Sequence, residues 1–324
     1  QAYSASFVEP WLGGKKPNSL SFSVYYTIQS NGIKSAEEGR ADMHIFGVSS
    51  GLGKRLQWPD DYFNLYHELS YQKYSLHNFS YNYLFNFSDG ESNNISWSTT
   101  FSRNSVDQPI YPRRGSSFAL SLQLTPPYSY INELIGNEKD YLTMSDQEKY
   151  KFIEYHKWKF TSLWYTKLAG DLILQSKIEF GFLGMYNHDI GPSPFEGFNM
   201  GGDGLMTYNL YGKETISLRG YGNGSITPLK GGNIYDKFSL ELRYPLSLNP
   251  NATIYVHAFA DGGNAWYQFS DFSPFDIKRA AGVGIRIFLP MFGKLGVDWG
   301  YGFDDPVRPG ENKSQFHFII GQNF

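Results

Sequence analysis

Side chains alternate in character from one residue to the next over segments of about ten residues, and this pattern restricts the fold more than any other feature. In residues 19–27, apolar or aromatic side chains take the even positions and hydroxyl side chains take the odd ones. Residues 238–244 and 282–289 alternate in a similar way. Because successive side chains of a strand point to opposite faces, each segment predicts a strand. Large apolar residues on one face and small or charged residues on the other are typical of a membrane barrel with a wet lumen.

We predict about 13 such strands in an all-β, transmembrane antiparallel barrel. Residues 62–86 contain no turn signal stronger than His77-Asn78, so we interpret them as one strand rather than two. Single-chain bacterial barrels have even strand numbers, and an odd number therefore predicts that strands are missing from this chain. With 62–86 divided into its two possible strands, the ranges are 2–9, 18–29, 40–54, 62–74, 76–86, 94–106, 116–127, 154–168, 171–186, 234–246, 252–268, 277–289, 294–303 and 314–324.

Short and long connections alternate, as expected for periplasmic turns and longer extracellular loops. Residues 128–153 and 187–233 are the longest connections, and we expect both on the outer side. Ser145 to Glu148 have the sequence of a capping box and predict a short helix through about Glu154, which could be a lid or could pack on a partner. The short turns are expected at 10–17, 56–61, 109–115, 169–171, 248–251 and 290–294.

Composition excludes several classes of protein. Aromatic and charged residues each make up 18% of the 324 residues, and mean hydropathy is -0.41. No stretch approaches the 18 or so consecutive apolar residues of a membrane helix, which excludes a helical membrane protein. The net charge of -3 and the lack of a Lys/Arg run argue against a nucleic-acid partner. Without cysteine there are no disulfides, thiolate metal sites or cysteine nucleophiles.

Catalytic and metal-binding patterns are lacking. The seven histidines are dispersed without ligand spacing, and no G-x-S-x-G nucleophile motif occurs. We therefore expect no catalytic residue, metal or cofactor, and we expect that the protein is not an enzyme. The chain begins QAYSASFVEP without a signal peptide, so we expect that an export signal was removed or lies outside this chain.

Four stretches in order resemble the BamA family, the outer-membrane β-barrel assembly proteins of the POTRA-barrel superfamily. The first is SFVEPWLGGKKPNSLSFSV at residues 6–24, and the second is QPIYPRRGSSFALSLQLTPP at residues 108–127. The third, residues 194–228, contains Leu218-Arg219-Gly220-Tyr221, which matches the family's V/I-R-G-F/Y motif at the tip of its long sixth extracellular loop. The fourth comprises SLELRYP, DGGNAW and the terminal FHFIIGQNF.

The resemblance implies a C-terminal barrel domain that has sixteen strands in the family. The SFVEPW segment resembles the fourth of them, so residues 1–324 would form a single barrel domain without the first three strands and without the POTRA domains. Residues 187–233 would be a long extracellular loop that folds inward.

The resemblance also implies a role for Arg219. In the family this arginine reaches into the lumen and is held by acidic residues, which by position are Glu241 and Asp261 here. The alternation supports this, because both acids fall on polar faces of their strands. An exposed loop arginine is the alternative.

The terminal strand of the family closes the barrel through few hydrogen bonds and forms a lateral gate. In this chain the corresponding residues are Phe316, Phe318 and Ile320, which alternate outward, with Gly321 and Phe324 near the end. Gly321 lacks a Cβ and would permit a kink. The terminal Phe could also simply anchor the strand at the membrane interface.

The function implied by the resemblance is ATP-independent folding and insertion of outer-membrane β-barrel proteins through a lateral gate, in the bacterial outer membrane. Expected partners are unfolded outer-membrane proteins, accessory outer-membrane lipoproteins, periplasmic chaperones and the lipid bilayer. A related two-partner-secretion or autotransporter-assembly pore is one alternative, and a passive porin or a soluble carbohydrate-binding sandwich are others.

Overall fold

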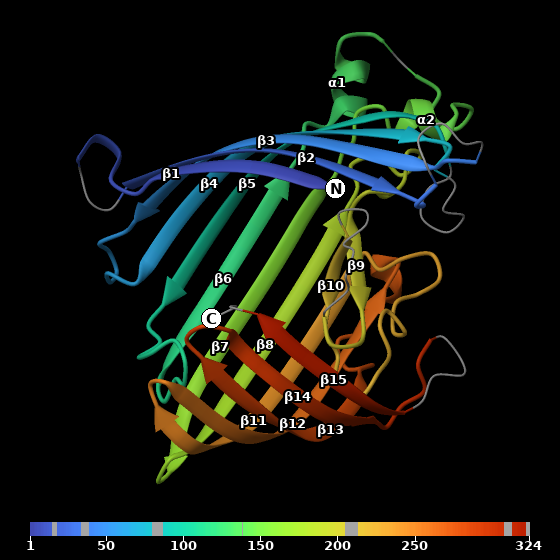
Figure 1. Ribbon diagram of the computed structural model, residues 1–324. Coiled ribbons are helices and arrows are strands. Elements are labelled where there is room, and N and C mark those ends of the chain that lie inside the picture. Colours follow the sequence, from blue (N-terminus) through green and yellow to red (C-terminus); the bar gives the residue numbers. More distant parts are fainter. Residues whose placement is uncertain are drawn as a thin grey trace. The chain divides into compact units, whose positions relative to one another are not determined.

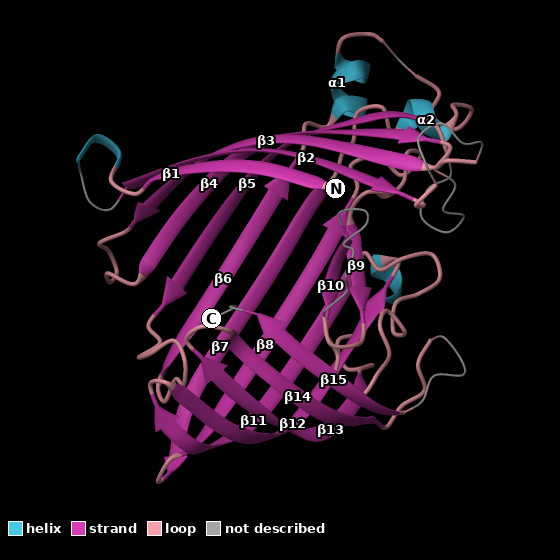
Figure 2. Cartoon of the chain, in the orientation of Figure 1, coloured by secondary structure: helices cyan, strands magenta, loops and turns pink. Residues whose placement is uncertain are grey.

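The computed structural model describes residues 1–14, 18–33, 39–79, 87–137, 139–204, 213–307 and 313–321. Strands account for most of the described chain, and only short helices occur between them (Figure 2). By contacts between Cα atoms, the chain divides into two compact units. One comprises residues 1–102, 120–158 and 183–195, and the other comprises 103–119, 159–182 and 196–324.

One sheet of 13 strands dominates the described residues, in the order β1-β2-β3-β4-β5-β6-β7-β8-β11-β12-β13-β14-β15. The pairs with a printed register, such as β11 with β12 and β14 with β15, are antiparallel, and Figure 1 shows β11 to β15 running side by side. The predicted number of about 13 antiparallel strands is confirmed. The bounds are β1 Ala2–Glu9, β2 Asn18–Ser30, β3 Asp42–Arg55, β4 Phe63–His77, β5 Gly90–Asn104, β6 Gly115–Leu124, β7 His156–Ala169, β8 Leu172–Gly184, β11 Ile234–Asn249, β12 Ala252–Trp266, β13 Lys278–Leu289, β14 Gly293–Gly302 and β15 Ser314–Gly321.

The two faces of these strands differ as the alternation predicts. In β11, Leu240 and Tyr244 are each 51% exposed, whereas Glu241 and Arg243 are 7% and 6% exposed. A sheet that exposes apolar side chains and buries charged ones inverts the arrangement of a soluble core. It is the arrangement of a strand with lipid on one side and an enclosed polar interior on the other.

The strand expected across residues 62–86 is shorter than predicted. β4 ends at His77, and Asn78 adopts a positive φ of 48°. The backbone N–H of Asn78 donates to Oδ1 of Asp89 at 2.7 Å, which fixes the turn. Asparagine tolerates this left-handed conformation better than most residues, so the weak His77-Asn78 signal was a true turn. The possible second strand at 76–86 falls mostly outside the described residues.

The predicted helix from Ser145 to about Glu154 is also shorter, because α2 spans Asp146–Lys149. The capping box between Ser145 and Glu148 is present. Beyond it, the chain pairs with Asn93, whose backbone accepts from the N–H of Ile153 at 2.9 Å. Tertiary pairing therefore ends the helix. A second helix, α1 (Tyr128–Leu134), was not predicted.

Two short strands and two 3-10 turns complete the described part of the chain. The loop at 187–233 contains a parallel pair that was not predicted, β9 (Gly197–Met200) with β10 (Lys213–Ile216). Two single 3-10 turns occur at Leu12–Gly14 and Phe269–Asp271. Among the described residues, no helix is both long enough and apolar enough to cross a membrane.

Candidate functional site: a loop arginine held by buried carboxylates

The tip of the 187–233 loop is buried in the second compact unit. Leu218 is fully buried, Arg219 is 9% exposed and Tyr221 is 2% exposed. The backbone N–H of Leu218 donates to the carbonyl of Gly202 at 3.0 Å. The motif therefore lies inside the protein, and the alternative of an exposed loop arginine is wrong.

Arg219 contacts both acids that the family resemblance implies for it. Its Nε and Nη2 donate to the two carboxylate oxygens of Asp261 at 2.7 and 2.8 Å. Its Nη1 donates to Oε1 of Glu241 at 2.7 Å. A guanidinium matches a carboxylate in a two-pronged geometry, and such charge-assisted hydrogen bonds are the stronger ones. The side chain of Asp261 is only 1% exposed, so this pair is held away from bulk water.

Three further contacts of Arg219 were not predicted. Nη1 lies 3.3 Å from Oδ2 of Asp298 on β14, and Nη2 donates to the Ser239 hydroxyl at 3.2 Å. The guanidinium carbon lies 3.6 Å from the ring centroid of Phe259, the geometry of a cation–π contact. The alternation of β14 could have indicated Asp298, because it shares a face with glycines at 296 and 300 while large apolar residues occupy the other face.

A second layer of charges surrounds this arginine. Arg243 donates to Oε2 of Glu241 through Nε at 2.9 Å and Nη2 at 2.6 Å. Arg286 donates to both oxygens of Asp298, at 2.6 Å through Nη2. Three arginines thus face three carboxylates, and the formal charges of these six side chains cancel. Buried charges are tolerated only when paired in this manner.

Gly220 brings the loop against the terminal strands. Its φ is +86°, and a Cβ there would lie 2.9 Å from the Cβ of Ala280 and from the carbonyl carbon of Tyr301. Its backbone N–H donates to Nε2 of His317 on β15 at 2.8 Å. His317 is 3% exposed and must present an unprotonated Nε2 to accept this bond. Glycine is required here both for the backbone conformation and for the close approach.

Tyr221 fixes the other side of the loop tip. Its hydroxyl donates to the carbonyl oxygen of Arg279 at 2.7 Å and accepts from the N–H of Asp304 at 3.3 Å. Burial raises the pKa of Tyr221 to about 12, so the hydroxyl keeps the proton that it donates. Leu218 is therefore bound within its own loop, and the other three motif residues contact neighbouring strands or loops.

The residues assigned to a gate lie apart from this charge cluster. Phe316, Phe318 and Ile320 are 66%, 54% and 67% exposed, on the face opposite to His317. Gly321 is still paired with Lys294 of β14, and Phe324 lies outside the described residues. Their role in a gate stays a prediction.

The hydrogen bonds of this site hold the loop tip in place. Each carboxylate that Arg219 contacts is hydrogen-bonded to a guanidinium, so none of them is poised as a free base. In the described part of the chain, no group of three or more His, Asp or Glu side chains is arranged to hold a metal ion. The arrangement secures a loop to the inner face of β11, β12, β14 and β15.

Comparisons with known proteins bear on the fold of the chain. The chain is similar over 98% of its length to BamA from Haemophilus ducreyi lacking POTRA domains 1-3, with a TM-score of 0.67 and 19% identity. It is also similar to CdiB from Escherichia coli and from Acinetobacter baumannii, with TM-scores of 0.55 and 0.53, identities of 13% and 14%, and coverage of 98% and 97% of the chain. A search of curated proteins found no match.

The likeness to solved structures confirms the predicted fold class. The chain spans 61% of the length of the Haemophilus BamA chain and 52% and 48% of the two CdiB chains. The model of the Omp85 superfamily domain matches residues 1–324. From end to end, then, this chain belongs to the Omp85 superfamily.

Proposed function

We propose that this chain is the barrel part of a bacterial outer-membrane protein that folds and inserts other outer-membrane β-barrels through a lateral gate. The reaction needs no ATP. Its partners are unfolded outer-membrane proteins, brought by periplasmic chaperones, together with accessory outer-membrane lipoproteins. The observation that most supports this proposal is a direct hydrogen bond between the loop tip and the terminal strand. The backbone N–H of Gly220 donates it to the His317 side chain.

The terminal strand has the properties that an insertase needs. In the described sheet β15 comes last in the strand order, with β14 as its paired neighbour. If β15 closes the barrel through few hydrogen bonds, as the family resemblance implies, opening of that seam would offer unpaired N–H and C=O groups that template another strand. Addition of an incoming strand by β-augmentation would satisfy its backbone before it meets lipid, where unpaired polar groups are costly. The outward Phe316 and Phe318 would meanwhile keep β15 in contact with the bilayer.

The 187–233 loop holds β15 in place against its neighbouring strands. Arg219 joins β11, β12 and β14 through Glu241, Asp261 and Asp298. Gly220, the next residue, reaches β15. A strand whose free edge must open and pair repeatedly needs its other edge and its inner face held in register, and the seated loop supplies that support.

Reconstitution tests the proposal. The full-length protein would be inserted in liposomes, and a urea-unfolded outer-membrane barrel would be followed as it acquires protease resistance. We expect faster folding than in empty liposomes, with the gain lost in Arg219→Ala and retained in Arg55→Ala, an exposed arginine at the end of β3. Folding no faster than in empty liposomes would refute an insertase.

A two-partner-secretion pore is the second candidate, favoured by the similarity to two CdiB structures over nearly the whole chain. The same liposomes separate the two functions. A secretion pore would leave the folding rate of the unfolded barrel unchanged and would release an entrapped small solute. An insertase would accelerate folding whether or not solute is released.

A further inference from the structure

A small cavity lies beside the charge cluster, next to the turn at residues 109–112. Its volume is about 50 Å³, enough for a few water molecules or one small oxyanion. Its lining includes the aromatic residues Tyr165 and Tyr255 and, as its charged side chains, Arg243, Arg286 and Lys294. Three of these side chains are cationic, and no carboxylate is among them.

The hydroxyl of Tyr255 is the first sign that the cavity has an occupant. Tyr255 is 2% exposed, and its hydroxyl has no hydrogen-bond partner within the described residues. Its ring packs against Tyr111, at 5.2 Å between centroids, which holds the side chain in position. A buried hydroxyl without a partner is costly, so a ligand that accepts its hydrogen would be favoured.

Lys294 is the second and independent sign. The arginines around the cavity are paired, Arg243 with Glu241 and Arg286 with Asp298. Lys294 is partly buried, and across the described chain no carboxylate forms an ion pair with it. Arg243 and Arg286 repel it electrostatically, whereas Glu241 and Asp298, which already pair with these arginines, attract it from a greater distance than an ion pair. Because the six-residue cluster is neutral, Lys294 gives the cavity a net charge of one positive unit.

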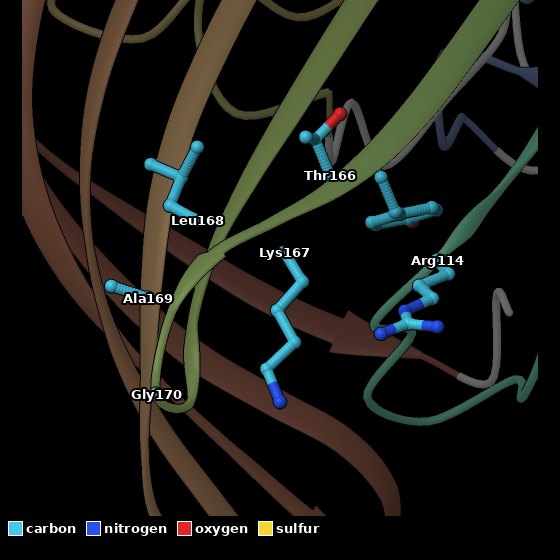
Figure 3. A pocket seen from close by; sticks show the side chains of 7 residues that line it. Arg114, Thr166, Lys167, Leu168, Ala169 and Gly170 are labelled. Carbon is cyan, nitrogen blue, oxygen red and sulfur yellow. The ribbon is translucent and has the colours of Figure 1, made fainter.

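An open space with basic side chains shares Tyr165 with the cavity. This larger space lies beside the turn at Gly170. Arg114 and Lys167 extend into that space (Figure 3). Basic side chains in such a space raise the local concentration of anions.

We propose that this cavity binds a small phosphate-type oxyanion, held by the Lys294 ammonium and the Tyr255 hydroxyl beside the guanidinium groups of Arg243 and Arg286. The anion would neutralise Lys294 and give Tyr255 its missing acceptor. It would also connect β12 to β14 close to the turn at 109–112. The phosphate could be free in solution or belong to a lipid headgroup, and both present the same oxygens.

Binding of inorganic phosphate to the detergent-solubilised protein is the test. Calorimetry at constant ionic strength, with chloride in place of phosphate as the blank, should give one site per chain. Lys294→Gln should raise the dissociation constant by about tenfold, the loss of one charge-assisted hydrogen bond. Tyr255→Phe removes only the hydroxyl and should raise it severalfold. Lys54→Gln, at the exposed end of β3, should leave it unchanged.

Two outcomes would overturn the proposal: no stoichiometric binding by the wild type, or equal binding by wild type, Lys294→Gln and Tyr255→Phe. Migration on unboiled SDS gels shows whether each variant is folded, and Tyr255→Phe keeps the test valid if Lys294→Gln does not fold. Phosphatidylglycerol micelles that compete with inorganic phosphate would identify the headgroup as the source. Absence of competition would identify free phosphate.

Discussion

Replacing Arg219 by alanine should lower the free energy of unfolding by about 3 to 5 kcal/mol, the cost of leaving one partner of a buried ion pair alone. The structure shows which partner is left. Glu241 keeps Arg243, and Asp298 keeps Arg286. Asp261 loses both of its bonds to a guanidinium and keeps only the Ser239 hydroxyl, at 2.6 Å. Most of the loss should therefore originate at Asp261.

A double-mutant cycle tests that assignment. Asp261→Ala removes the stranded carboxylate, so Arg219→Ala combined with Asp261→Ala should be less destabilised than the sum of the two single variants, by about 2 to 3 kcal/mol. The measurement is urea unfolding in lipid vesicles, followed by fluorescence of the seven tryptophans. Arg114→Ala, an exposed arginine, should change stability by less than about 0.5 kcal/mol. If the double variant loses as much unfolding free energy as the two single variants together, the reasoning is refuted.

Three other perturbations address the loop tip. Gly220→Ala should cost about 1 to 3 kcal/mol more than Gly136→Ala, because both glycines have positive φ but only Gly220 has atoms within 4 Å of the added Cβ; equal losses in urea unfolding would contradict the close approach. His317→Phe leaves the Gly220 N–H without an acceptor and should cost about 1 to 3 kcal/mol, with faster hydrogen exchange at Gly220, whereas His77→Phe at the exposed end of β4 should not change that exchange. Finally, hydrogen bonds from Arg279 hold the pKa of Asp304 below its usual range. A depressed folded-state pKa stabilises the protein above the unfolded value of about 3.9, and the contribution is lost as pH falls through the folded value. Protease cleavage near Asp304 should therefore rise below about pH 4, and Arg279→Gln should remove this dependence; cleavage independent of pH in the wild type would exclude the coupling.

Sequence periodicity predicts the strands and their faces well because lipid and lumen impose opposite demands on adjacent residues. This periodicity is enough to place Glu241 and Asp261 on the polar faces of their strands. Local sequence predicted the ends of elements less well where contacts with distant residues determine them. The helix after Ser145 ends early because Ile153 pairs with Asn93, and β4 ends where Asn78 bonds to Asp89.

The full set of partners of Arg219 and Gly220 could not be predicted from one sequence. Asp298, Ser239 and His317 come from three strands, and their meeting depends on strand order and on how deep the loop tip descends. Periodicity gives the face of a residue but not its height along the barrel axis. Pairing register supplies that height, for example Asp298 opposite His317.

The most direct test of an insertase is capture of a client strand at β15. Because the chain has no cysteine, single cysteines can be introduced at successive positions from 314 to 320, and one cysteine can be scanned through a strand of an incoming outer-membrane barrel. The account predicts disulfides that follow one antiparallel register along β15 during folding and vanish when folding is complete. Cross-links of equal strength at all pairs of positions, or none at β15, would contradict it.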